Sequence, residues 1–165
     1  MLAESLRTFY GYNRWATERL LDTATQLTAE QLDAPAGGEQ RSVHETLLHL
    51  MTTQKGWLSW WDGSLPADEA YGLRLDPAQY PDVAAIRELW DALEQQTQAF
   101  LARLDDELLQ RVYSSQLPDG SEWQMVLWKM MLHIANHGTQ HRSEAAALLT
   151  GFGHSPGDLD MIFYL

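Results

Sequence analysis

The chain has 165 residues, of which 45% are hydrophobic and 21% charged, so it can build one buried core and is too apolar for a disordered chain. Its net charge of -12 excludes nucleic acid as an expected partner, because proteins bind phosphates chiefly through lysine and arginine. We therefore expect a single domain spanning residues 1–165 that binds no nucleic acid.

The N-terminal segment has a helical pattern from its start. Apolar residues recur at three- and four-residue steps over residues 3–26, which predicts a helix, and Asn13 places a polar group on its apolar stripe. The segment lacks the basic end and apolar run of a secretory signal, and no apolar run in the chain approaches the ~20 residues that cross a bilayer. We expect a cytoplasmic protein with no membrane partner.

The second long helix is predicted over residues 42–61, where the capping box "SVHE" opens an apolar periodic stretch. A further capping box at residues 28–31 predicts a short helical turn before it, and "DAPAGGEQ" at residues 33–40 predicts a loop. His44 lies in the first turn of the second helix, where we expect it to be exposed. His49 lies in mid-helix, on the flank of the apolar face.

The second half of the chain predicts two further helices. Glycine and proline make residues 62–80 a long crossover loop, after which a heptad-like seam predicts a helix over residues 81–104. A turn at residues 119–120 is the tip of a candidate hairpin, and a capping box opens the last helix, over residues 121–150. We expect the apolar tail, residues 154–165, to pack back on the helices. The fold class is all-α, a four-helix bundle with a crossover between its second and third helices.

Three histidines at intervals of four, His133, His137 and His141, fall within roughly 80° of one another on a helix. Apolar residues share their sector, so we expect it to face inward, with Ala135 and Arg142 on the opposite side. Paired imidazoles at this spacing can bind one metal ion, but each can also be a core side chain bonded to a carbonyl. Because the chain has no cysteine, any metal must be held by histidine, aspartate or glutamate.

A ligand from another helix would strengthen the metal hypothesis. The remaining histidines are His44, His49 and His154, and His49 is the best candidate because of its place beside the core. Glu144 is either a fourth ligand or a carboxylate that accepts an imidazole N–H. Asn13 either orients a ligand or a bound water, or is satisfied by a neighbouring helix.

The chain resembles the DinB family in the segments "YNRWATERLLD", "SVHETLLHL", "HIANHGTQHR" and "GDLDMIFYL", which span essentially its whole length in the right order. The resemblance implies an up-down-down-up bundle, commonly a homodimer, with one divalent metal ion held by His49, His137 and His141. It leaves His133 outside the coordination shell, so that His133, Glu144 and Asn13 are candidates for the surrounding layer. The family often has His-Arg-Gly-Gln where this chain has residues 141–144, which makes Glu144 atypical.

Three imidazoles leave a divalent ion with an open position, as in catalytic sites. We hypothesise an enzyme whose ion activates water or a small thiol cosubstrate against an electrophilic small molecule, hence a hydrolase or the thiol-dependent transferase that the resemblance implies. Zinc and nickel are the ions that we expect first, although imidazole also suits copper and iron. The alternative is a non-catalytic metal-binding stress or DNA-damage-inducible protein with a closed coordination shell. DNA binding, suggested by the family's history, is disfavoured by the charge.

Overall fold

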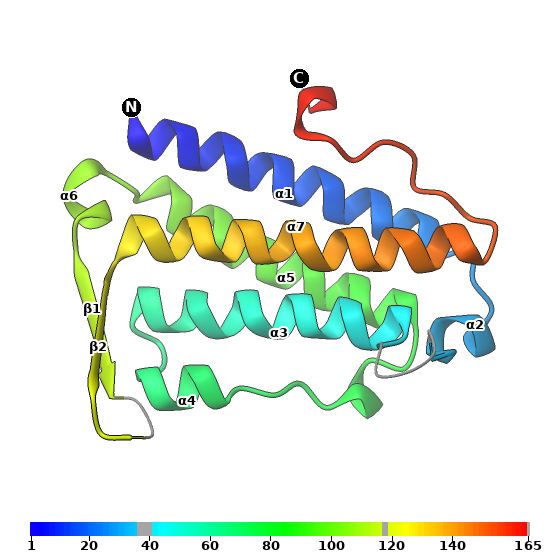
Figure 1. The fold of residues 1–165 in the computed structure, drawn as a ribbon, viewed down its shortest axis with the longest axis horizontal. Coiled ribbons are helices and arrows are strands. Elements are labelled where there is room, and N and C mark those ends of the chain that lie inside the picture. Colours follow the sequence, from blue (N-terminus) through cyan, green and yellow to red (C-terminus); the bar gives the residue numbers. More distant parts are fainter. Residues whose placement is uncertain (36–40, 117–118, 165) are drawn as a thin grey trace.

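Long helices form a bundle in this computed structural model, which describes residues 1–35, 41–116 and 119–164 (Figure 1). The bundle helices are α1 (Leu2–Ala24), α3 (Val43–Asp62), α5 (Val83–Ala102) and α7 (Leu127–Gly151). α1 and α7 run in one direction, and α3 and α5 run in the other (Figure 1). The all-α fold and its up-down-down-up order are therefore as predicted.

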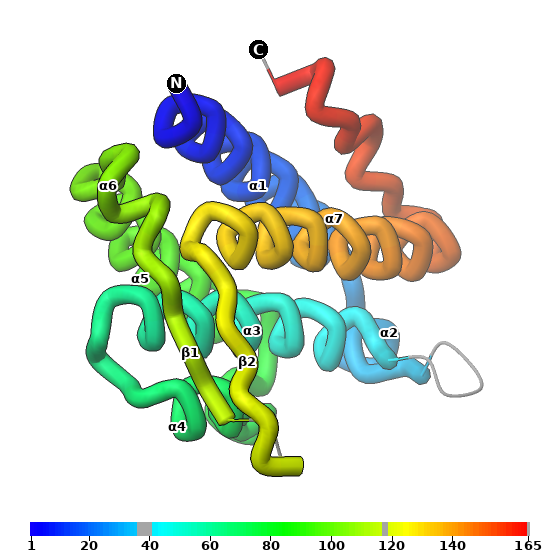
Figure 2. The backbone as a smooth tube through the Cα atoms, turned by 60° about the vertical axis from the view of Figure 1, so that its left-hand side comes forward, coloured from blue at the N-terminus to red at the C-terminus, as the bar shows by residue number. Residues whose placement is uncertain are grey.

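The apolar faces of these helices meet in one core. It takes fully buried side chains from each of them, among them Leu20, Met51, Trp90 and Met130. α7 packs chiefly against α3 and α1, and α5 packs against α3 on the far side of the bundle (Figure 2). None of the helices in the described part of the chain combines the length and the apolar character that a bilayer crossing requires.

The capping boxes predicted at residues 28–31 and at the start of α3 are both present. In α2 (Ala29–Asp33) the Thr28 hydroxyl accepts a hydrogen bond from the Gln31 backbone N–H, and in α3 the Ser42 hydroxyl accepts one from that of Glu45. Each cap satisfies a backbone donor that the first turn of a helix leaves without an intrahelical partner. Much of the loop expected over residues 33–40 lies outside the described residues, since 36–40 are not among them.

The crossover between α3 and α5 joins two helices that run in the same direction, but it is more ordered than the predicted loop. It contains a short helix, α4 (Ala67–Gly72), and the 3-10 turn η1 (Pro77–Gln79). α4 packs closely on α3 at Gly56, where a Cβ atom would lie 2.5 Å from the Ala70 carbonyl oxygen. The approach depends on a glycine in another helix, which is why local sequence did not reveal it.

The predicted hairpin is present, but the predicted start of the last helix is wrong. α6 (Asp106–Leu109) leads into β1 (Val112–Gln116), which pairs antiparallel with β2 (Glu122–Val126), and α7 begins only at Leu127. The expected capping box at residues 121–124 does not form because Glu122–Val126 pairs as a strand, and the Ser121 N–H instead donates to Asp119 Oδ1 at 2.9 Å within the turn. Leu117 and Pro118 lie outside the described residues.

The C-terminal tail returns along α1 (Figure 1). Arg19 Nη2 donates a hydrogen bond of 2.9 Å to the Pro156 carbonyl, and the Tyr164 ring lies 6.0 Å from that of Trp15 and above Gly11. The expected docking holds only for part of the tail, because the side chains of the last 3-10 turn, η2 (Met161–Phe163), are exposed.

Candidate metal centre

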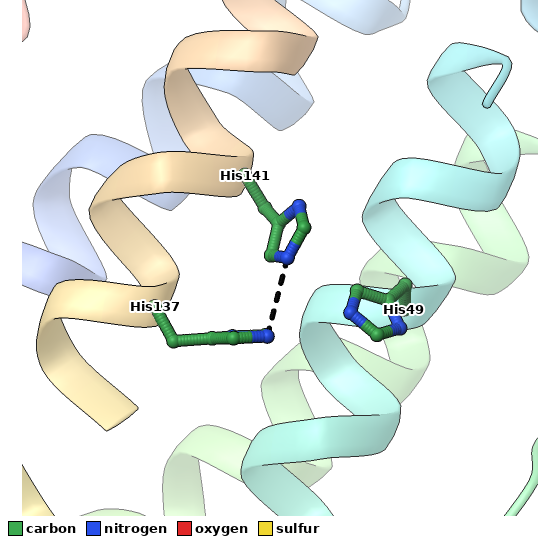
Figure 3. Close-up of side chains that lie close together, drawn as sticks. All are labelled: His49, His137 and His141. Carbon is green, nitrogen blue, oxygen red and sulfur yellow. Dashed lines mark hydrogen bonds between the residues drawn. The ribbon is translucent and has the colours of Figure 1, made fainter. Parts of the chain in front are cut away.

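Three imidazoles from two neighbouring helices converge between α3 and α7 (Figure 3). His49 projects from α3, and His137 and His141 project from successive turns of α7. One ring nitrogen of each lies within 4.8 Å of the others. The ring centroids of His137 and His141 are 4.4 Å apart, and that of His49 lies 4.6 Å from His141 and 5.2 Å from His137.

A glycine of α7 leaves room for the Arg142 side chain beside the cluster. A Cβ atom at Gly138 would lie 2.7 Å from Arg142 Nη1 and 3.7 Å from Leu50 Cδ1, the residue after His49. Any larger residue would have to displace the end of the Arg142 side chain, whereas its contact with Leu50 would be of ordinary van der Waals length. Gly138 was not singled out in the sequence, although a glycine inside a predicted helix usually has a packing or functional reason.

Glu144 fixes the orientation of His141. Its Oε2 atom lies 2.6 Å from His141 Nδ1, while His141 Nε2 points toward His137 Nε2 at 3.1 Å. A proton on Nδ1, donated to the carboxylate, leaves the Nε2 lone pair directed into the cluster. Of the two interpretations of Glu144, this contact matches the one in which it accepts an imidazole N–H.

The ionisation of these groups favours metal binding. Burial, reinforced by nearby positive charge, lowers the pKa of both His49 and His137 to about 4, so both rings are neutral at pH 7. Burial opposes ionisation of Glu144, but its hydrogen bonds to His141 and Gln140 outweigh that effect and lower the pKa of the carboxyl. Metal ions bind neutral imidazole, and His49 and His137 are held in that form.

The donor set fits a divalent transition metal. Three imidazole nitrogens within 4.8 Å of one another are close to the spacing of ligands that share one ion at ~2.0–2.1 Å. Imidazole accepts zinc, nickel, copper and iron, so the ligands do not select one of them. The three residues that the family resemblance assigned to the metal are those that the structure brings together, and their role as ligands stays a prediction.

His133 lies beside the cluster rather than in it. Its side chain is exposed, and its ring centroid lies 6.2 Å from that of His137 and 5.9 Å from that of Trp57. The expectation that all three histidines of α7 face inward is wrong for this one, whose ring lies against Trp57 but stays open to solvent.

Asn13 contacts the opposite side of α7. Arg142 Nη2 donates to Asn13 Oδ1 at 2.5 Å, and the guanidinium carbon lies 5.4 Å from the centre of the Tyr12 ring. Of the two interpretations of Asn13, satisfaction by a neighbouring helix is therefore the one observed. The side of α7 that carries Ala135 and Arg142 is also buried, because α1 covers it, and this burial lowers the pKa of Arg142.

His44, expected to be exposed, is buried, with 7% of its surface accessible. Its Nδ1 atom lies 2.6 Å from Asp33 Oδ1 and its Nε2 atom 2.8 Å from the Tyr80 carbonyl oxygen. Both partners come from segments that approach the start of α3 only in the folded chain. The last histidine, His154, contacts Gln26 through Nδ1 at 3.1 Å.

Comparison with known proteins gives a consistent result. The model of the DinB family matches residues 1–165. A curated relative, Protein DinB of Bacillus subtilis (strain 168), is 24% identical over 157 residues, which cover 94% of this chain and 91% of the relative. YfiT from Bacillus subtilis, described as a probable metal-dependent hydrolase with an unusual four-helix bundle topology, is similar in structure, with a TM-score of 0.71 and 19% identity over 92% of this chain and 90% of that one. A DinB-like protein from the same organism has a TM-score of 0.67 and 14% identity, over 90% and 94% of the two chains.

Proposed function

The chain belongs to the DinB family, and we propose that it is a metal-dependent enzyme that acts on an electrophilic small molecule. The observation that carries this proposal is the convergence of His49, His137 and His141 from two helices. The description of YfiT as a probable metal-dependent hydrolase supports hydrolysis as the reaction class.

The residues of the cluster have distinct roles in this proposal. His49, His137 and His141 would hold one divalent ion, with zinc or nickel first among the candidates. When bound, such an ion lowers the pKa of a water molecule or thiol and so supplies a nucleophile at neutral pH. Glu144 keeps the proton of His141 on Nδ1, so that Nε2 stays free to bind. Burial keeps His49 and His137 unprotonated near neutral pH.

The nucleophile is either water or a small thiol. Three protein ligands leave a position for it, as in catalytic zinc sites. Because Glu144 contacts His141 Nδ1, it supports an open rather than a closed coordination shell. The chain contains no cysteine, so a thiol would come from solution as a cosubstrate. We place hydrolysis first and thiol transfer second.

Elemental analysis of the purified protein, joined to X-ray absorption at the metal edge, tests the site. We expect one ion per chain, three nitrogen ligands and at least one further oxygen ligand from solvent. The loaded protein is then assayed with activated esters and lactones, and with electrophiles plus a low-molecular-weight thiol. His137→Ala should abolish both metal and turnover, and His133→Ala, on the same helix, is the matched control for metal content.

Two results would contradict the enzyme proposal. A closed shell that includes the Glu144 carboxylate, together with no turnover, would favour the non-catalytic metal-binding protein. Failure to bind metal after reloading would make the three histidines a packing cluster.

The expected homodimer and the absence of a nucleic-acid partner stay predictions. Sedimentation velocity measures the first. Duplex DNA binding at physiological salt, where a chain of net charge -12 should show none, measures the second.

A further inference from the structure

A cavity of about 490 Å³ lies at the end of α3, between that helix, α4 and the β-hairpin. Trp57 and Trp60 of α3 and Trp123 of β2 line it, together with residues of α4 and β1. Its volume falls in the range of sites that bind small molecules. None of the three candidate metal ligands lines it, so it is a separate space.

The tryptophans form one apolar wall of the cavity. The ring centroid of Trp57 lies 5.7 Å from that of Trp60 and 6.3 Å from that of Trp123, and the last two are 6.0 Å apart. At these distances the rings contact one another, so no space remains between them for a caged cation. All three rings are only partly buried, which leaves apolar surface open to a ligand.

Beside Tyr71, Gln116 and Asp68, small side chains contribute much of the remaining lining. Gly56, Ala67 and Ala70 line the cavity on the α3–α4 side, and Ser115 lines it on β1, directly opposite Trp123 in the hairpin register. Large rings that meet small side chains leave room for a further ring of similar size. Among the described residues that line the cavity, the charged group is a single carboxylate, Asp68, and there is no lysine or arginine, which disfavours an anionic ligand.

A row of rings, Trp57, His133 and His137, leads from the cavity wall to the histidine cluster, and the His133 side chain in the middle is exposed. The His133 ring lies edge to face against Trp57, at 5.9 Å, and 6.2 Å from the His137 ring. Two ring-to-ring steps thus join the tryptophan wall to a candidate metal ligand. One small molecule can span that separation, with its apolar end in the cavity and its reacting end at the cluster.

We propose that this cavity binds a neutral aromatic group of the substrate, held against Trp57, Trp60 and Trp123 while the electrophilic end reaches the histidine cluster. That the electrophilic end reaches the histidine cluster rests on the proposed function. That the cavity binds a neutral aromatic group is argued from the cavity lining alone and can be tested without any enzyme activity.

The test is binding of N-phenyl-1-naphthylamine, a neutral fluorescent naphthalene, to the metal-free and metal-loaded protein. We expect one probe per chain, with quenching of tryptophan emission. Trp123→Ala, which removes part of the wall, and Ala67→Phe, which fills the space and keeps the wall, should each weaken binding by about tenfold or more. Trp128→Ala is the matched control, because Trp128 is a half-buried tryptophan of α7 that does not line the cavity.

The variants separate this inference from the metal proposal. His137→Ala should lose metal and turnover but bind the probe as the wild type does. In the active enzyme, Trp123→Ala should reduce the preference for aryl over short alkyl esters, measured as a ratio of kcat/KM values, by about tenfold. Circular dichroism and thermal melting show whether each variant is folded.

Unchanged probe affinity in both Trp123→Ala and Ala67→Phe would overturn the proposal. A wild-type protein that excludes the probe and sediments as a dimer would also overturn it, by assigning the cavity to a second copy of the chain. Probe binding without turnover on any substrate would leave the cavity as a binding site and defeat the proposed function instead.

Discussion

The two histidines of α3 show how differently one helix can use the same side chain. The His44 ring has an oxygen against each nitrogen, from Asp33 and from Tyr80. The His49 ring, a little more than one turn later, has other imidazoles as its neighbours, and no hydrogen bond to an oxygen is found for it in the described part of the chain. Burial alone therefore does not mark a functional histidine.

His44 differs from the histidines of the cluster in the partners that its ring nitrogens find. A polar group removed from water costs free energy unless it finds a partner, and His44 has found two. His49 and His137 are partly buried and can share one partner only if a ligand from solution joins them. We interpret His44 as a structural clamp and the cluster as a site.

Removing a member of the cluster has the largest expected effect. His49→Ala, His137→Ala or His141→Ala should abolish stoichiometric metal binding, because two imidazoles hold a divalent ion far less well than three. His133→Ala and His44→Ala should leave most of the metal in place. Mass spectrometry of metal content after dialysis measures it, and an equal loss in all five variants would remove the distinction between clamp and site.

Removing Glu144 tests whether its contact with His141 strengthens metal binding without coordinating the ion. Glu144→Ala should weaken metal affinity by about 10- to 100-fold, because His141 loses the acceptor that fixes its proton on Nδ1. Competition with a chelator gives the affinity. Gln140→Ala is the control, because it removes the hydrogen bond from Gln140 to Glu144 and keeps the contact between Glu144 and His141. Complete loss of the metal would instead assign Glu144 as a ligand.

For His44 we expect the opposite pattern, a loss of stability without a loss of metal. His44→Ala should lower the free energy of unfolding by about 2–3 kcal/mol, because the ring fills a buried position and joins α3 to Asp33 and to Tyr80. Metal stoichiometry should not change. Urea unfolding measures the loss, with His154→Ala as a control that removes an exposed contact. Full stability in His44→Ala would mean that its two contacts contribute nothing.

The buried carboxylate of Glu94 is an intermediate case, with fewer hydrogen-bond partners than the His44 ring. Burial raises the pKa of Glu94, whose side-chain oxygen accepts one hydrogen bond, from Gln98. Its charged form therefore destabilises the folded chain above its folded pKa, and the penalty disappears as the pH falls below the unfolded value. Glu94→Gln should stabilise the chain by on the order of 1 kcal/mol at pH 7, and less at pH 4.

Thermal unfolding at several pH values measures this gain. Glu88→Gln, an exposed position on the same helix, should change little at either pH. A gain that grows as the pH falls would show that the sign assigned to Glu94 is wrong.

Local patterns predicted the parts of the fold that depend on local physics. Helical periodicity and the capping boxes at Thr28 and Ser42 are properties of neighbouring residues, and both are present in the structure. The start of α7 was not predictable in this way, because "SEWQ" fits a capping box and also a strand. Pairing of Trp123 and Met125 with β1 decides in favour of the strand.

For the candidate site, too, local patterns predicted only what depends on neighbouring residues. Spacing showed that the α7 histidines share a face, and the choice of His49 as their partner rested on its place beside the core. The selection of His137 and His141 over His133 came from the family resemblance alone. The clamp at His44, the cover of α1 over Arg142 and the contribution of Trp123 all depend on segments distant in sequence, which no local pattern reports.

The order of the bundle has a consequence for synthesis of the chain. α1 packs chiefly against α7, the last of the long helices, and α3 also has its main partner there. At about 5–20 residues per second, α1 waits several seconds on the ribosome before the helix that covers it has been made. During that interval its apolar stripe is open to chaperones and to other nascent chains, and the three histidines cannot yet meet. Both the core and the candidate metal centre therefore form only after α7 has been made.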